Sequence, residues 1–335
     1  MRSKFVIMRQ SKMGSDSQIQ VPVIKLISMG SDLDRGSEGW HNLCMRVREA
    51  CENYGCFEVI CDKIPIELRT ETFSAARQLF DLPVDAKQKG ANPMKPYRGY
   101  IGPNSSNPLN EAFAIEDGSN YDSLKSFTEV IRPVGNDQFC QAFSSTVKLL
   151  DELEHILELM ILDAYGLGEK NKSIVECKIT LLRLMKYKAP PSGESMEGFV
   201  AHTDKGLFTI LCEDQISGLE VETKDGQWIK LSPSPSSFVC FVGDSLMAWS
   251  NCRMHAVKHR VTMGGDKDRY SFGAFALPVD GTIVKAPKEF IDEEHPQVLR
   301  EFDFADYLNF FMNSNFEVKW AKLPELTIFA FAGIL

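Results

Sequence analysis

The sequence predicts an α+β fold in which a helical N-terminal part surrounds an all-β core in the C-terminal half. Three observations support this prediction. Apolar residues recur at helical spacing over 137–165, whereas short β-rich runs separated by turn residues fill the region from about 179 to 278. Hydrophobic residues make up 44% and charged residues 25% of the 335 residues, which is typical of a globular protein with a full-sized core.

The N-terminal part is predicted to begin with alternating strands and helices. Residues 20–25 indicate a first strand, and residues 37–54 have the apolar spacing of a helix that ends at Gly55, a residue suited to a C-cap. Residues 57–61 are β-rich, and a second helix is expected from about 66 to 82.

A long irregular stretch is expected over residues 84–122, where Pro, Gly, Asn and Ser are frequent. Long loops in compact domains often line or cover a site. The longest helix follows over 137–165 and ends at Gly166. A final helical part is expected over about 291–313.

The all-β core is predicted from eight short runs that alternate with turn signals such as Asp225-Gly226 and Gly264-Gly265. An antiparallel sandwich, a jelly roll or a barrel would each accommodate strands of this length and spacing. The runs are 179–188, 198–204, 207–214, 218–224, 227–231, 237–244, 256–262 and 269–278.

Composition excludes several classes of protein. A net charge of −9 argues against broad binding to nucleic acid or to anionic membranes, which requires basic patches. Nine cysteines, an odd number in a chain too large to need disulfides, indicate free structural thiols in a reducing compartment, so we expect a cytoplasmic protein. Residues 1–20 lack a signal-peptide core and are expected to be a disordered extension, and no apolar run reaches the roughly 18 residues of a membrane span.

The segment His202-Thr203-Asp204 ends one of the predicted strands. His202 and Asp204 point to the same face because strand side chains alternate. A third metal ligand is expected from the same β region, where His255 and His259 are the remaining histidines. Two histidines and one carboxylate on one side of a metal leave open positions for a bidentate cosubstrate and O₂, as in the facial triad of non-haem Fe(II) oxygenases.

Arg269 and Ser271 share one face of the strand that follows, ten residues after His259. A guanidinium and a hydroxyl together suit a buried carboxylate, because the arginine can pair with it bidentately and the hydroxyl adds a hydrogen bond. An antiparallel return strand would bring this pair beside the metal. The combination would hold a 2-oxo acid that has a second, distal carboxylate.

These motifs resemble the plant-type 2-oxoglutarate- and Fe(II)-dependent dioxygenases. That family has His-x-Asp, a second His some fifty-odd residues on, and Arg-x-Ser ten residues later. The chain has His202-x-Asp204, His259 and Arg269-x-Ser271. The resemblance extends from about residue 20 to about residue 315, and the segments LMKYKAP, AHTDKGLFTIL and MHAVKHRVTM are similar to the branch that holds the glucosinolate side-chain dioxygenases.

The resemblance implies a double-stranded β-helix core, of the jelly-roll or cupin-like kind, with flanking helices and a helical N-terminal region. It implies an N-terminal non-haem dioxygenase region over 21–125. The jelly-roll core, with a C-terminal helix and tail, would occupy 126–335.

The resemblance also assigns roles to the site residues. His202, Asp204 and His259 would be the catalytic iron ligands. His255 takes a position where the family has Lys, and a role for it beside the metal or the substrate stays open. Arg269 and Ser271 would hold 2-oxoglutarate.

Three residues of the segment 183–187 can be compared with the family motif around the cosubstrate. Tyr187 matches the tyrosine that assists in holding it, although a plain strand aromatic would also fit the sequence here. Met185 replaces the usual Asn of the family motif. Arg183 is expected to be a structural ion-pair partner.

The implied activity is a 2-oxoglutarate-dependent dioxygenation with Fe(II), O₂ and supporting ascorbate, which hydroxylates, desaturates or cyclises a small apolar plant specialised metabolite. Succinate and CO₂ would be the co-products, and a monomer without nucleic-acid or membrane partners is expected. Pocket candidates are Lys205, Phe208, Phe275 and the loop 97–101.

Alternative functions stay open. They are an oxidase that uses the same triad without 2-oxoglutarate, a hormone-modifying dioxygenase, a non-catalytic binding protein and a zinc hydrolase. The zinc hydrolase lacks an evident general base.

Overall fold

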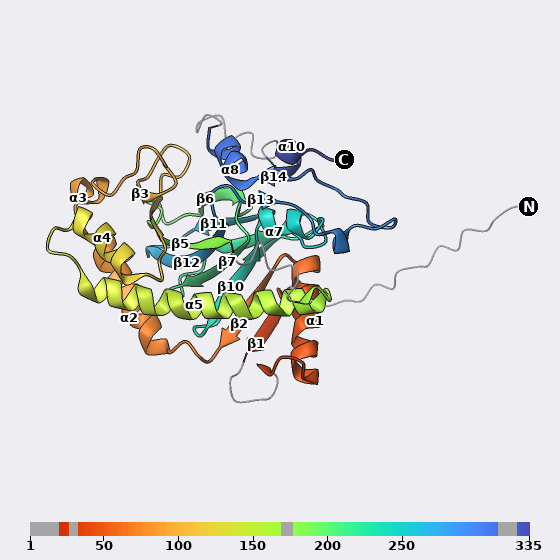
Figure 1. Ribbon diagram of the computed structural model, residues 1–335. Helices are drawn as coiled ribbons and strands as arrows, with labels where there is room; N and C mark the ends of the chain where they lie inside the picture. Colours follow the sequence, from red (N-terminus) through yellow and green to blue (C-terminus); the bar gives the residue numbers. More distant parts are fainter. Residues whose placement is uncertain (1–19, 27–32, 169–176, 314–326) are drawn as a thin grey trace, which may run out of the picture.

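The computed structural model describes residues 20–26, 33–168, 177–313 and 327–335, so the extension predicted over residues 1–20 lies almost wholly outside the described residues. The centre of the fold is an eight-stranded sheet (Figure 1). From one edge to the other its strands are β1 (Val23–Leu26), β2 (Cys56–Cys61), β10 (Ser237–Val242), β7 (Phe208–Glu213), β12 (Arg269–Pro278), β5 (Lys178–Tyr187), β4 (Asn110–Glu116) and β3 (Gly99–Ile101).

A second sheet has four strands, in the order β6 (Met196–His202), β11 (His259–Met263), β8 (Leu219–Glu222) and β9 (Trp228–Lys230). A short pair, β13 (Ile283–Val284) and β14 (Phe302–Asp303), completes the strands. An apolar cluster that includes Met185, Leu211, Leu219 and Val261 fills the space between the two large sheets. The two facing, largely antiparallel sheets confirm the predicted jelly-roll core.

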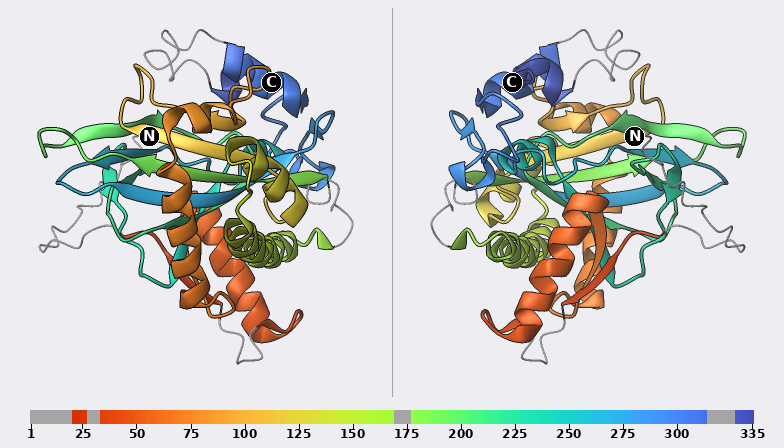
Figure 2. Two further views of the ribbon diagram at one scale, coloured as in Figure 1. Left: turned by 90° about the vertical axis from the view of Figure 1, so that its left-hand side faces the viewer. Right: turned by 90° about the vertical axis from the view of Figure 1, so that its right-hand side faces the viewer.

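The helices lie mainly on the outer face of the larger sheet. Figure 2 shows α1 (Glu38–Asn53), α2 (Ile66–Phe80) and α5 (Asp137–Ala164) together on one side of that sheet, with α8 (Phe304–Asn313) on the other. Ser37 caps α1 by accepting a hydrogen bond from the Trp40 N–H, and Asn136 caps α5 in the same way. The shorter helices are α3 (Val84–Gln88), α4 (Tyr121–Ile131), α7 (Asp244–Trp249) and α10 (Ile328–Ala332).

Two stretches differ from the predicted elements. The stretch 84–122 is not one irregular loop, because it contains α3, β3 and β4 and the start of α4. The residues of β4 are almost all buried, so the strand shows no alternation of polar and apolar residues. The predicted helix over 291–313 is formed only in its second half, as α8, because Pro296 and the short strand β14 interrupt the first half.

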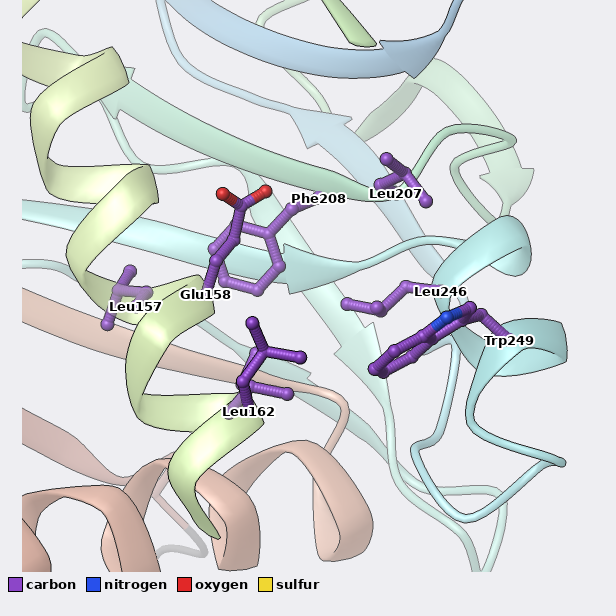
Figure 3. A pocket seen from close by; sticks show the side chains of 8 residues that line it. Leu157, Glu158, Leu162, Leu207, Phe208, Leu246 and Trp249 are labelled. Atoms are coloured by element: carbon purple, nitrogen blue, oxygen red, sulfur yellow. The ribbon is translucent and has the colours of Figure 1, made fainter. Parts of the chain in front are cut away.

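A charged cluster lies between α5 and β5, on the side of the sheet away from the second sheet. Lys178 pairs with Glu154 at 2.6 Å and also contacts Glu158. The Glu158 side chain borders a small apolar cavity, where it lies beside Phe208 (Figure 3). Burial, together with the neighbouring Glu154 carboxylate, raises the pKa of Glu158 to about 8.

The nine cysteines confirm the prediction of free thiols. Seven are buried, Cys252 is partly buried and Cys177 is exposed, and all nine are unpaired. Burial raises the pKa of the Cys212 thiol to about 12, which keeps it protonated and unreactive.

Candidate metal centre and cosubstrate pocket

The two sheets bring His202, Asp204 and His259 together. His202 ends β6, and His259 begins β11 directly opposite it in the antiparallel pair. Asp204 lies in the loop that follows β6, and its Oδ1 atom is 3.8 Å from Nε2 of each histidine. One ligand atom of each residue lies within 4.8 Å of the others, and no other group of three such ligands occurs among the described residues.

The backbone fixes which nitrogen of each imidazole faces this point. Nδ1 of His202 is 2.9 Å from the Val200 carbonyl oxygen, and Nδ1 of His259 is 3.3 Å from the Val257 carbonyl oxygen. A carbonyl only accepts hydrogen bonds, so Nδ1 must donate and Nε2 keeps a free lone pair. Burial, with the neighbouring His259, lowers the pKa of His202 to about 3, so this imidazole is neutral near pH 7.

The carboxylate of Asp204 is held by a hydrogen bond to the oxygen that points away from the two histidines. Thr209 on β7 donates a hydrogen bond to Oδ2 at 2.7 Å, which leaves Oδ1 directed at the two imidazoles. Burial alone would raise the pKa of Asp204, but the adjacent histidines and the Thr209 hydrogen bond outweigh it and lower that pKa. An ionised carboxylate beside two imidazoles whose Nε2 atoms face it is a ligand set that fits Fe(II).

Aromatic rings pack around the histidines. Phe241 stacks on His259 with ring centroids 4.6 Å apart, and Phe199 meets His202 edge-on at 4.9 Å. His255 lies before β11 rather than in it, where its backbone N–H donates to Cys51, and it is not among the residues that line the cavity. The even spacing of His255 and His259 therefore does not place both on the inner face, because the strand begins only at His259.

Arg269 and Ser271 lie on β12, opposite Tyr187 and Met185 of β5. Arg269 is completely buried, donates to Ser271 Oγ at 3.2 Å and has its guanidinium 5.2 Å from the centre of the Tyr187 ring. The Arg269 Nε atom is buried and has no hydrogen-bond partner in the described parts of the chain. A buried cation with an unused donor fits an incoming carboxylate.

A second partner of Arg269 was not anticipated from the sequence. Glu213 on β7 accepts a hydrogen bond from Arg269 Nη2 at 2.6 Å, and both side chains are buried. The antiparallel register places Glu213 opposite Ser271, so its acidic side chain belongs to the same inner face. The alternation along β7, with Thr209, Leu211 and Glu213 on one face, is the signal that could have found it.

A cavity of about 200 Å³ joins these two sites. The three candidate metal ligands, Arg269, Ser271 and Tyr187 all line it, together with apolar side chains of β5, β12 and α8. Of the predicted pocket residues, Phe275 and Lys205 line the cavity. The loop 97–101 contributes Tyr97 and Ile101.

Two aromatic residues proposed for the pocket face elsewhere. Phe208 points toward α5 (Figure 3), because it occupies the other face of β7 from Thr209. The prediction that Phe208 lines the pocket was therefore wrong. Tyr100 donates to Glu111 at 2.9 Å and does not line the cavity.

The helix α8 is tied to the loop that carries Asp204. Asp244 accepts hydrogen bonds from Thr203 at 3.0 Å, from Lys205 at 2.6 Å and from Tyr307 of α8 at 2.6 Å. This network joins residues far apart in the sequence, and no local pattern predicts it. Through it α8 forms one wall of the cavity.

Comparison with known proteins identifies the family. Residues 178–278 match the model of the 2OG-Fe(II) oxygenase superfamily, and residues 21–129 match the model described as non-haem dioxygenase in morphine synthesis N-terminal. A probable 2-oxoglutarate-dependent dioxygenase of Arabidopsis thaliana, AOP1.2, is 36% identical over 320 residues, which are 94% of this chain and 96% of the relative.

Solved structures agree with this result. The dioxygenase for auxin oxidation of rice is 32% identical, with a TM-score of 0.75 over 88% of this chain and 96% of its own. The Arabidopsis thaliana dioxygenase for auxin oxidation 1, in a binary complex with 2-oxoglutarate, is 28% identical, with a TM-score of 0.74 over 83% of this chain and all of its own. The chain belongs to the plant 2-oxoglutarate- and Fe(II)-dependent dioxygenases.

Proposed function

We propose that this dioxygenase oxidises a small, largely apolar plant specialised metabolite. O₂ and 2-oxoglutarate are consumed, and succinate and CO₂ are released. In a hydroxylation one oxygen atom enters succinate and the other enters the product. In a desaturation or ring closure the substrate instead loses two hydrogen atoms, which leave as water.

His202, Asp204 and His259 hold Fe(II) in this proposal, through the two Nε2 atoms and Asp204 Oδ1. Bound iron supplies the activation of O₂ that is coupled to decarboxylation of 2-oxoglutarate. Arg269 and Ser271 bind the C5 carboxylate of 2-oxoglutarate, and Tyr187 packs beside them.

The apolar lining of the cavity has two tasks in this proposal. It excludes water from the reacting groups, and it orients an apolar substrate. The wall formed by α8 contributes Leu308, Phe311 and Met312. The protein thus provides geometry rather than acid–base catalysis.

One observation carries the proposal. Three convergent metal ligands and a buried arginine–serine pair open into the same cavity, with a volume of about 200 Å³ for cosubstrate and substrate. A metal hydrolase would need a general base at the metal instead of a carboxylate clamp.

The test is succinate formation from 2-oxoglutarate with Fe(II), O₂, ascorbate and a panel of plant metabolites. We expect iron-dependent succinate, with product masses shifted by about +16 for hydroxylation or −2 for desaturation. His202→Ala should abolish it. His41→Ala, an exposed histidine of α1, is the matched control and should leave it unchanged. Product formation without 2-oxoglutarate would favour an oxidase that uses the same triad alone.

A hormone substrate is the second candidate. The structures similar to this chain include dioxygenases for auxin oxidation from rice and Arabidopsis thaliana. Auxin therefore belongs in the substrate panel, and its turnover at rates above those of the other compounds would select this candidate.

We also propose that the enzyme acts as a monomer in the cytoplasm. The unpaired, mostly buried thiols fit a reducing compartment. Within the described residues, no helix combines the length and the apolarity needed to cross a membrane. Size-exclusion chromatography with light scattering tests the oligomeric state, and a fluorescent fusion tests the location.

A further inference from the structure

Arg183 is a charged residue of the cavity that has no role in the proposed reaction. It lies on β5 four residues, about 13 Å along the strand, from Tyr187, and an even step in a strand keeps both on the same face. It lines the cavity of the metal centre. Its neighbours in register are Gly273 and Ala114, so neither adjacent strand covers it with a long side chain at that level.

The charge of Arg183 has no partner in the described part of the chain. Its guanidinium makes neither a hydrogen bond nor an ion pair there, contrary to the expected structural ion pair. The other cations of the cavity are paired, Arg269 with Glu213 and Lys205 with Asp244.

The surroundings of Arg183 add to this unbalanced charge. Burial lowers the pKa of Arg183, Tyr187 and Asp204 act to raise it, and the neighbouring Arg98 lowers it further. An arginine nevertheless stays protonated in a protein. The cavity therefore contains a guanidinium charge that no carboxylate of the described residues contacts.

Arg98 gives a second, independent observation. The residue is 7% exposed, its Nη2 forms an ion pair with Oε1 of Glu116 at 3.0 Å, and its Nε and Nη1 have no hydrogen-bond partner among the described residues. Of these two guanidinium groups, which influence each other electrostatically, Arg98 is paired with one carboxylate and Arg183 with none. Desolvated cations without counter-charges are costly, so this arrangement favours a bound anion.

The anion is not 2-oxoglutarate. In the proposed function its C5 carboxylate pairs with Arg269, and its C1 carboxylate and 2-keto group chelate the iron, so both carboxylates are already engaged. Asp204 does not satisfy Arg183 either, because Thr209 donates to one of its oxygens and iron would bind the other in the proposed function.

We infer that the substrate carries a carboxylate, which pairs with Arg183 while its apolar body packs between β12 and α8. This inference rests on the proposed function and specifies its substrate class. The planar guanidinium matches a carboxylate bidentately. The apolar body would contact Leu181, Phe275, Leu277, Leu308, Phe311 and Met312, which line the same cavity.

The test is a binding titration of matched probes. The protein is loaded anaerobically with Fe(II) and saturating 2-oxoglutarate, so that Arg269 is occupied. The probes are 3-phenylpropionate and 1-naphthaleneacetate, each compared with its primary amide, and dissociation constants are measured by calorimetry. The variants are Arg183→Gln and Arg183→Lys. Arg260→Gln, which removes an arginine paired with Glu220 outside the cavity, is the control.

Wild-type protein and the control should bind each acid about tenfold or more tightly than its amide, as charge-assisted pairing requires. Arg183→Gln should reduce that ratio to near one, and Arg183→Lys should restore part of it. The inference is overturned if acids bind no better than amides, or if Arg183→Gln leaves the ratio unchanged. It is also overturned if Arg183→Gln weakens the binding of 2-oxoglutarate and of the acid probes to the same extent, because Arg183 would then bind the cosubstrate.

Succinate release without any probe separates this inference from the proposed function. Slow uncoupled turnover by wild-type protein and by the Arg260→Gln control at equal rates supports the proposed function whatever the probe ratio. Failure of the wild type to bind 2-oxoglutarate would instead refute the proposed function itself.

Discussion

Replacing Glu213 with glutamine tests whether the Glu213 charge stabilises the buried Arg269 guanidinium until 2-oxoglutarate binds. Glu213 Oε2 accepts a hydrogen bond from Arg269 at 2.6 Å inside the core. Glutamine keeps the shape and still offers an oxygen acceptor, but it removes the negative charge. We therefore expect two opposite effects, weaker folding without 2-oxoglutarate and tighter binding of 2-oxoglutarate.

The magnitudes follow from the burial of the pair. Breaking a buried ion pair costs about 3–5 kcal/mol, and the retained amide oxygen should reduce this loss of unfolding free energy to about 1–3 kcal/mol. In the complex, Glu213 and the C5 carboxylate would share one guanidinium at a separation of about 6 Å, where like charges repel by about 3 kcal/mol at an effective dielectric constant near 20. Relaxation absorbs part of this repulsion, so we expect the dissociation constant to fall about tenfold, or about 1.4 kcal/mol.

Thermal unfolding with and without 2-oxoglutarate, combined with calorimetric titration, measures both effects. Glu213→Gln should melt below the wild type without 2-oxoglutarate and show the larger rise in Tm when 2-oxoglutarate is added. Ser271→Ala is the contrasting variant, because it removes a hydroxyl beside Arg269 and should weaken binding of 2-oxoglutarate. If Glu213→Gln binds 2-oxoglutarate no more tightly than the wild type, the repulsion argument is wrong and Glu213 serves only to position Arg269.

Three further predictions concern the surroundings of the site and the helix-covered face of the large sheet. Thr209→Val removes the donor to Asp204 and should weaken Mn(II) binding about tenfold or more in a metal titration; unchanged affinity would contradict this role. Glu158→Gln should raise the free energy of unfolding by on the order of 2 kcal/mol at pH 8 and by less at pH 5, as measured by denaturant unfolding. The reason is that the pKa of Glu158 is near 8 in the folded protein, so the wild type loses stability as the pH rises from about 4.5 to 8. Equal gains at both pH values would refute this prediction. Tyr307→Phe frees Asp244 from α8 and should lower kcat/KM several-fold without changing the affinity for 2-oxoglutarate; a normal kcat/KM would show that α8 needs no such link.

The pairs His202–Asp204 and Arg269–Ser271 could be predicted from the sequence because each is a local pattern of two residues. His202 and Asp204 are two residues apart, and His259 begins the strand that pairs with β6 opposite His202. Arg269 and Ser271 are likewise two residues apart on one strand face. Each of these two pairs needs only the alternation of strand side chains, whereas His259 is assigned from the resemblance to the family's motif.

The rest depends on contacts between distant elements. Glu213 reaches Arg269 only through the register of β7 against β12, and Tyr307 reaches Asp244 only through the docking of α8. The face of Phe208 was misjudged because its run is apolar on both faces, and β4 was missed for the same reason. The unpaired state of Arg183 is a property of the folded cavity and has no counterpart in the sequence pattern.

A crystal structure of the protein grown anaerobically with Fe(II) and 2-oxoglutarate tests the central claim most directly. The account predicts iron about 2.0–2.2 Å from Nε2 of His202, Nε2 of His259 and Oδ1 of Asp204. It predicts the C5 carboxylate of 2-oxoglutarate on Arg269 and Ser271. Iron bound elsewhere, or a 2-oxoglutarate whose C5 carboxylate lies away from Arg269, would contradict it.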